Sequence, residues 1–178
     1  MRKLSIIRGN SGSGKTTVAK ELQNRFGRNT MLISQDMIRR EVLKVNDGEN
    51  MPAIFLMKEL LKYGNIHSKV IILDGIMYAD WHNSLFQLAI ELYDSKIHAY
   101  YFDLPFEEAL TRHKTKAICH EFGEEEMRKW WREKGFSDIL HEVSITSEER
   151  GVENIYNVVL NGKIIILLRQ WNIHQIFL

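Results

Sequence analysis

Cysteine is nearly absent from this chain, since Cys119 is the only one among 178 residues. The chain therefore cannot form an internal disulfide, which excludes a small secreted domain held together by several such bonds. A single cysteine is compatible with a reducing compartment.

Long apolar runs are missing as well. No stretch approaches the roughly 20 apolar residues of a membrane-spanning helix. The first three residues, Met-Arg-Lys, are followed by a short apolar segment and a glycine-rich loop, not by the apolar core of a signal peptide. We therefore expect no membrane partner and a cytoplasmic location.

Neither sign of charge is in excess, with 24 basic and 23 acidic residues. This balance gives no large basic field for nucleic acid, although it leaves room for a local basic groove. Hydrophobic residues make up 44% of the chain, as in ordinary globular proteins. The length predicts a single domain over residues 1–178.

Residues 9–16, Gly-Asn-Ser-Gly-Ser-Gly-Lys-Thr, match the phosphate-binding pattern G-x-x-x-x-G-K-[ST] at every fixed position. Its glycines let backbone N–H groups converge on phosphate oxygens. Lys15 is expected to reach the β- and γ-phosphates, and the Thr16 hydroxyl to bind Mg²⁺. The residues expected to contact the nucleotide are Gly9, Asn10, Ser11, Gly12, Ser13, Gly14, Lys15, Thr16 and Thr17.

The flanks of this loop have the required context of a strand before it and a helix after it. An apolar stretch, Leu4–Arg8, precedes it, and apolar residues recur at helical spacing up to Phe26. Thr17 stands where a dinucleotide fingerprint or a protein-kinase loop needs glycine or alanine. The motif is therefore interpreted as a P-loop.

Apolar strands alternate with helical patterns along the chain, which predicts an α/β fold of three layers. We expect a P-loop NTPase fold with a mostly parallel five-stranded sheet, helices on both faces and a small lid. The expected strands are Lys3–Arg8, Thr30–Ser34, Val70–Leu73, Ala99–Phe102 and Glu142–Ile145. The expected helices are Lys15–Phe26, Asp36–Leu43, Ala53–Tyr63, Trp81–Tyr93, Pro105–His113 and Ser147–Leu160.

Three segments extend this core. Residues 37–66 include a polar loop and are expected to bind the acceptor. Residues 114–135 are dense in charge and are expected to form the lid. The apolar tail, residues 161–178, could add a strand, pack on a helix or join two subunits, so a homo-oligomer is one possibility.

A P-loop needs a second acid near the metal, and Asp74 directly follows the buried strand Val70–Leu73. The carboxyl ends of parallel strands are where ligands of such sheets gather. Asp74 and Thr16 are therefore the predicted Mg²⁺ ligands. The alternative is that Asp74 only caps the turn before Gly75.

Asp36 ends the second strand and opens a helix, from which Arg39 or Arg40 projects one turn later. A carboxylate at this place could accept the proton of an attacking hydroxyl. Arg39 could grip an anionic or polar acceptor with its planar guanidinium. The alternative is that Asp36 is a helix N-cap and the arginines form a solvated face.

Cations that close over the nucleotide assist phosphoryl transfer. Arg112 is the first candidate for this role and Arg128 the second, with Lys114, Lys116 and Arg132 also in the segment. Trp130 and Trp131 are expected to pack the lid. We interpret His113, His120 and Glu121 as lid surface rather than as a metal site.

These motifs together resemble those of P-loop kinases of the polynucleotide-kinase, zeta-toxin and chloramphenicol-phosphotransferase kind. The resemblance rests on Gly9–Thr16, Asp36-x-x-Arg39, the strand ending at Asp74, and Phe102–Pro105 followed by Arg112, within residues 1–135. It implies that Asp36 is the general base, that Arg39 binds an acceptor phosphate, and that a basic residue after the Pro105 helix assists transfer.

The sequence thus predicts an ATP- and Mg²⁺-dependent phosphotransferase with an unidentified acceptor. Lys15, Asp36, Arg39, Arg112 and Arg128 are its predicted catalytic residues. The acceptor is expected to bear a hydroxyl group: a nucleoside, a sugar derivative, an antibiotic or a nucleic-acid end. The alternatives are an ATPase or nucleotide-dependent switch that acts on a protein partner, and a nucleotide binder without turnover.

Overall fold

The computed structural model describes residues 2–115, 122–146 and 148–161. Five strands form one sheet in the order β2-β3-β1-β4-β5, and every neighbouring pair is parallel. The strands are β1 (Lys3–Gly9), β2 (Thr30–Ser34), β3 (Val70–Asp74), β4 (Ile97–Phe102) and β5 (Val143–Ile145). The predicted α/β fold is confirmed.

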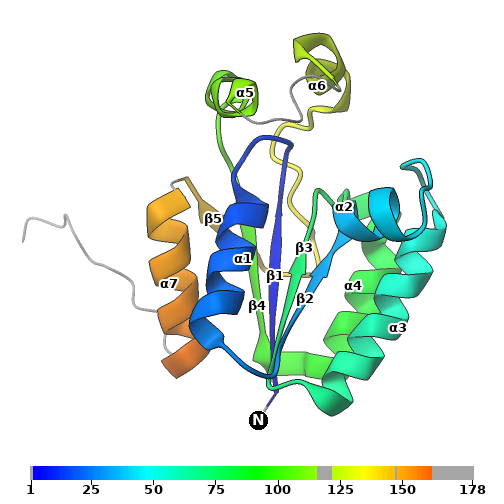
Figure 1. The fold of residues 1–178 in the computed structure, drawn as a ribbon, viewed down its shortest axis with the longest axis vertical. Coiled ribbons are helices and arrows are strands. Elements are labelled where there is room, and N and C mark those ends of the chain that lie inside the picture. Colours follow the sequence, from blue (N-terminus) through cyan, green and yellow to red (C-terminus); the bar gives the residue numbers. More distant parts are fainter. Residues whose placement is uncertain (1, 116–121, 147, 162–178) are drawn as a thin grey trace, which may run out of the picture.

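Helices cover both faces of the sheet, as Figure 1 shows. One face is covered by α1 (Lys15–Phe26) and α7 (Glu148–Asn161), and the other by α3 (Pro52–His67) and α4 (Ala79–Tyr93). Each face has its own apolar core: Leu4 and Ile6 of β1 lie in one, and Ile7 in the other. Side chains alternate across a strand, so one strand supplies both cores.

The helix predicted over Asp36–Leu43 is wrong in its type. A short α-helix, α2 (Gln35–Met37), continues into a π-helix, η1 (Ile38–Val42). Helix α3 runs four residues beyond its predicted end at Tyr63. A short 3-10 helix, η2 (Asp94–Lys96), precedes β4.

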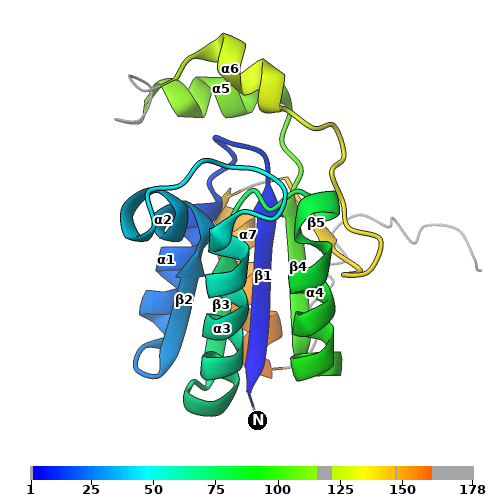
Figure 2. The same cartoon turned by 90° about the vertical axis from the view of Figure 1, so that its right-hand side faces the viewer.

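Helix α5 (Phe106–Lys114) leads into the segment expected to form the lid, and α6 (Glu124–Trp130) lies within that segment. The sequence analysis anticipated α5 but not α6. Both lie over the carboxyl ends of the strands, where the P-loop also lies (Figures 1 and 2). Residues 116–121 of the expected lid and residues 162–178 of the expected tail lie outside the described residues.

Strand register brings the predicted site residues to one edge. Asp74 is paired with Ile7 of β1 on one side and with Ser34 of β2 on the other. Gly9 lies two residues after Ile7, and Asp36 lies two residues after Ser34. The P-loop, Asp74 and Asp36 therefore emerge side by side at the carboxyl edge of the sheet.

Candidate active site

The P-loop backbone needs its glycines for two reasons, conformation and space. Gly12 and Gly14 have φ values of 79° and 93°, in the left-handed region that favours glycine. A Cβ at Gly12 would lie 2.4 Å from the carbonyl oxygen of Ala109 on α5. The loop therefore forms a turn that contacts α5.

Lys15 is folded back over this turn. Its ammonium donates to the carbonyl oxygen of Asn10 at 2.7 Å and to the Ser13 hydroxyl at 3.2 Å. The side chain is buried among the loop atoms, at 6% exposure. A cation is thus fixed where the predicted phosphates would lie.

Thr16 and Asp74 meet as predicted. The Thr16 hydroxyl donates to Asp74 Oδ2 at 2.9 Å, and the Ser34 hydroxyl donates to the same oxygen at 3.4 Å. Asp74 Oδ1 is buried and has no hydrogen-bond partner. Burial raises the pKa of the Asp74 carboxyl, and the charge of Lys15 opposes the shift.

This pair fits a magnesium ion. Mg²⁺ prefers oxygen ligands and is usually held by one or two carboxylates together with water and phosphate oxygens. The unpartnered Asp74 Oδ1 and the Thr16 hydroxyl are such ligands. In the described part of the chain, no cluster of three or more His, Cys, Asp and Glu could hold a metal by itself.

Asp36 lies beside two arginines of η1. Its Oδ1 accepts from Arg39 Nη2 at 3.2 Å and lies 3.8 Å from Arg40 Nε. The carboxylate is about half exposed, at 48%. Isolated π-turns occur often at functional sites, and here the π-helix carries both arginines.

One cleft of about 970 Å³ is lined by the P-loop, Thr16 and the Asp36 group, although not by Asp74. P-loop residues Gly12, Lys15 and Thr16 line it, and so do Asp36 and Arg39 across from them. The wider set of lining residues is Ser11, Gly14, Thr17, Lys20, Glu21, Asn24, Arg40, Asn46, Asp47, Ile76, Tyr78, Trp81, His113, Phe122, Trp130 and Val152. The expected nucleotide site and the expected acceptor site therefore lie in the same cleft.

The predicted lid arginines are held by glutamates. Arg112 pairs with Glu108 at 2.9 Å. Arg128 pairs with Glu124 at 2.8 Å and lies over the Phe106 ring, 4.2 Å from its centroid. Neither arginine is among the residues that line the cleft.

The lid has a small core of its own, built around Leu110 and Met127. Trp131 packs edge-on against Phe106, as expected of a lid-packing residue, whereas Trp130 lies at the cleft and is 47% exposed. The surface interpretation of His113 is wrong. That side chain is buried, stacks on Phe122 and lies 2.9 Å from the Phe122 carbonyl oxygen.

A second arginine of the lid segment, Arg132, lies close to the P-loop. The Asn10 side-chain amide donates to the Arg132 carbonyl oxygen at 2.8 Å and accepts from its N–H at 3.2 Å. The Tyr78 hydroxyl donates to the Trp130 carbonyl oxygen at 2.6 Å. The segment after α6 is therefore tied to the first variable residue of the P-loop and to the loop after β3.

Gln35, the residue before Asp36, belongs to a buried chain of hydrogen bonds. The side-chain oxygen of Gln35 accepts from the Met77 N–H at 3.1 Å, and its nitrogen lies 3.2 Å from His82 Nε2. Burial lowers the pKa of His82 to about 4, so the ring is neutral at pH 7. Its Nδ1 then donates to the Tyr78 carbonyl oxygen at 3.1 Å and its Nε2 accepts from Gln35.

Comparison with known proteins agrees with this geometry. The AAA domain family matches residues 4–133, most of the chain. The chain belongs to the AAA domain family. No curated protein matches it.

Solved structures share the fold at low sequence identity. A putative kinase from Chloroflexus aurantiacus has a TM-score of 0.63 at 12% identity, covering 91% of this chain and 98% of that chain. Shikimate kinase from Acinetobacter baumannii in complex with shikimate has a TM-score of 0.59 at 17% identity, with coverages of 92% and 96%. APS kinase from Mycobacterium tuberculosis in complex with AMPPNP and APS has a TM-score of 0.58 at 14% identity, with coverages of 89% and 98%.

These matches show that the fold of this AAA domain protein is that of P-loop kinases. The predicted P-loop NTPase fold is confirmed. No helix in the described residues combines the length and apolar character of a membrane span.

Asn46, Asp47 and Tyr78 line the cleft but were not singled out in the sequence, although Asn46 and Asp47 fall in the segment expected to bind the acceptor, residues 37–66. The signal available for Asp47 was the Asp-Gly pair in a polar loop, which indicates a turn and nothing more. The position of Arg132 beside Asn10 had no signal in the sequence, because 122 residues separate the two.

Proposed function

We propose that this protein is an ATP-dependent phosphotransferase that moves the γ-phosphoryl group of ATP to a hydroxyl group, or a phosphate, of a small acceptor. One observation carries the proposal: the P-loop and the carboxylate–arginine group of Asp36, Arg39 and Arg40 line the same cleft. The alternatives, an ATPase or a switch, do not require a second set of polar groups facing the P-loop.

The nucleotide end of the cleft follows from the P-loop. Backbone N–H groups of residues 9–16 receive the phosphates, and Lys15 supplies a fixed positive charge where negative charge develops during transfer. Thr16 and Asp74 would hold Mg²⁺, which supplies charge neutralisation on the phosphates when bound. ATP as the donor, Mg²⁺ and a cytoplasmic location all belong to this proposal.

At the acceptor end, Asp36 orients the acceptor hydroxyl and accepts its proton. Arg39 and Arg40 keep the carboxylate in place and present further donors to the acceptor. The acceptor lies between η1 and the loop from Gly75 to Trp81. The likeness to shikimate kinase and APS kinase supports a small polar acceptor.

Arg112 and Arg128 remain the proposed lid cations. Each is paired with a glutamate of its own helix, so each would exchange that partner for a phosphate when the lid closes over ATP. Exposed ion pairs of this kind contribute little to stability, so the exchange has a small energetic cost.

The experiment that tests the proposal follows the γ-phosphoryl group. Purified protein, Mg²⁺ and γ-labelled ATP are incubated with a panel of hydroxyl-bearing acceptors, and label is measured in acceptor and in inorganic phosphate. A phosphotransferase places label in one acceptor and consumes ATP faster in its presence. Turnover to inorganic phosphate that no acceptor changes, but a protein partner stimulates, would favour the switch instead.

A further inference from the structure

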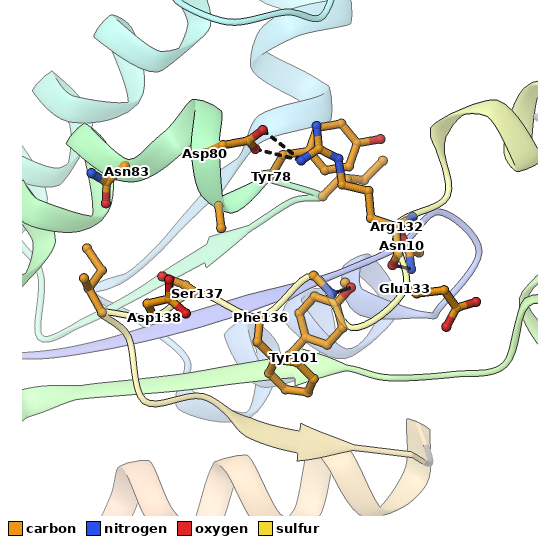
Figure 3. A pocket seen from close by; sticks show the side chains of 15 residues that line it. Asn10, Tyr78, Asp80, Asn83, Tyr101, Arg132, Glu133, Phe136, Ser137 and Asp138 are labelled. Carbon is orange, nitrogen blue, oxygen red and sulfur yellow. Dashed lines mark hydrogen bonds and ion pairs between the residues drawn. The ribbon is translucent and has the colours of Figure 1, made fainter.

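A second cavity, of about 670 Å³, lies next to the cleft and is shown in Figure 3. It has two lining residues in common with the cleft, Ile76 and Tyr78, on the loop that follows β3. This is the loop beside which the proposed acceptor lies. Ile76 and Tyr78 therefore lie at the boundary that the second cavity shares with the cleft.

Several elements build the cavity walls. Helix α4 contributes Asp80 and Asn83, and the segment after α6 contributes Ser137 and Asp138 (Figure 3). The rings of Tyr101 and Phe136 lie together at one side, with centroids 4.5 Å apart. An aromatic surface ringed by hydroxyl, amide and carboxylate groups suits a compact group with many hydroxyls.

The charge of the cavity is negative. Arg132 is the one cation among its described lining residues, and both oxygens of Asp80 lie 2.9 Å from Arg132 Nη1. The same guanidinium lies over the Tyr78 ring, 4.0 Å from its centroid. Because Asp80 neutralises Arg132, the carboxylates of Glu133 and Asp138 leave the lining with excess negative charge.

Hydrogen-bonding groups remain for a ligand. Ser137 is only 8% exposed, and its backbone N–H, rather than its hydroxyl, donates to Glu142 at 2.7 Å. Asn83 presents an amide with both a donor and an acceptor. These groups pair with hydroxyls equally well as donors and as acceptors.

The walls are held in place by a buried arginine. Arg8 has no exposed surface, and its guanidinium donates to the Gly135 carbonyl oxygen at 2.7 and 3.1 Å and to the Met77 carbonyl oxygen at 3.2 Å. The Tyr101 hydroxyl accepts from the Gly135 N–H at 3.2 Å. A cavity fixed on two sides in this way is preorganised for a ligand.

We propose that the second cavity is an acceptor subsite for a neutral or positively charged, hydroxyl-rich group, such as a sugar or an amino sugar. This proposal rests on the proposed function, because it assigns the cavity to the same acceptor. Its negative charge disfavours a nucleic-acid end or a phosphorylated sugar at this place, since like charges repel across a few ångströms.

Binding of three probes of different charge tests the subsite without requiring turnover. The probes are kanamycin (cationic), maltotriose (neutral) and a 5′-hydroxyl trinucleotide (anionic), titrated in the presence of a non-hydrolysable ATP analogue. Asn83→Trp fills the cavity, and Ser84→Trp, on the next residue of α4 and outside both linings, is the matched control.

We expect kanamycin to bind about tenfold more tightly than the trinucleotide, a factor that corresponds to about 1.4 kcal/mol. Asn83→Trp should weaken kanamycin and maltotriose about tenfold or more, whereas Ser84→Trp should leave both unchanged. Asp138→Asn should weaken the binding of kanamycin more than that of maltotriose. Asp94→Asn, in η2 beyond the far end of α4, should weaken neither.

Three results would overturn the subsite: no binding of kanamycin or maltotriose, tighter binding of the trinucleotide, or equal affinities in Asn83→Trp and the parent protein. A failure of the proposed function looks different. In that case the cavity-dependent binding persists, but no label passes from ATP to any acceptor in the transfer assay.

Discussion

The positive charge of the P-loop lies on the buried ammonium of Lys15, which donates hydrogen bonds to the Asn10 carbonyl oxygen and the Ser13 hydroxyl. Replacement by alanine removes the cation that faces the developing charge of the transferred group. We expect Lys15→Ala to lower the turnover number by about 10²- to 10³-fold, measured as ATP consumption with the best acceptor.

The control for this variant is Lys62→Ala, because Lys62 is an exposed lysine of α3 paired with Glu59. Its turnover should equal that of the parent protein. Retention of full turnover by Lys15→Ala would contradict the placement of the phosphates in the P-loop.

Asp36 is the proposed general base of the transfer. Asn at this position keeps the size of the side chain but cannot accept a proton, so Asp36→Asn should reduce transfer by about 10²- to 10⁴-fold. Affinity for ATP should change little, because the phosphate-binding residues are untouched. Rapid-quench measurement of labelled product, with a parallel titration of an ATP analogue, checks both parts.

Undiminished transfer by Asp36→Asn would show that another group is the base. A drop in nucleotide affinity as large as the drop in transfer would instead indicate that Asp36 acts on the nucleotide site.

Single residues were predictable from the sequence where a motif fixes their neighbours. The contact of Thr16 with Asp74 follows from a P-loop and a strand-terminal acid on adjacent strands. The sequence did not predict that Arg112 and Arg128 pair with glutamates. A glutamate one turn away competes with the expected phosphate for each guanidinium. The charge of a lid residue says little about the direction in which it points.

Among the elements, the P-loop and the segment after α6 are joined by the Asn10 side chain. Asn10→Ala removes both hydrogen bonds and leaves the loop backbone intact. At about 0.5–1.5 kcal/mol per bond, it should speed local opening of residues 130–135, measured by amide hydrogen exchange, and raise the KM for the acceptor.

Asn157→Ala is the matched control, since it removes an exposed amide that bonds Glu153 on α7. In Asn157→Ala, amide hydrogen exchange in residues 130–135 should equal that of the parent protein. Equal exchange rates in both variants would show that the Asn10 contacts do not hold the lid segment.

Helix α4 is joined to α2 through His82 and Gln35, and this contact predicts a pH dependence. The pKa of His82 is about 4 in the folded chain, against about 6.5 when unfolded. Above pH 6.5, neutral His82 makes its full contribution to the free energy of unfolding. As the pH falls from 6.5 towards 4, the His82 side chain is protonated in the unfolded chain but not in the folded one, and stability is lost.

Between pH 7.5 and 4.5 this loss amounts to about 2–3 kcal/mol. His82→Gln should therefore show a smaller fall in the free energy of unfolding over the same interval, measured by urea titration. The difference between the two proteins isolates His82 from other titrating groups. Parallel pH profiles would contradict its burial in the neutral form.

Elements with a strong apolar period were predictable, and those defined by long-range contact were not. Strands β1 to β5 were found within a few residues, and the central strands β1 and β3 are buried and mostly apolar, as is typical of parallel sheets. Helix α6 was missed because Met127 is its one buried residue, and seven residues, mostly charged, show no apolar stripe. The π-helix η1 depends on the i+5 bond from Leu43 to Ile38, which leaves no mark in the sequence.

At the scale of the whole molecule, the sheet order places β1, which leads into the P-loop, between β3 and β4. Figure 2 shows α5 and α6 above the carboxyl ends of the strands, over this junction. A ligand that binds there should stabilise the entire fold. At a free concentration of 100 times its Kd, Mg²⁺–ATP should add about 2.7 kcal/mol to the free energy of unfolding.

Titration of the purified chain with Mg²⁺ and a non-hydrolysable ATP analogue, followed by calorimetry, tests the central claim most directly. The account predicts saturable binding of one nucleotide per chain, weakened by Lys15→Ala and unaffected by Lys62→Ala. A complete lack of affinity for nucleoside di- and triphosphates would contradict it.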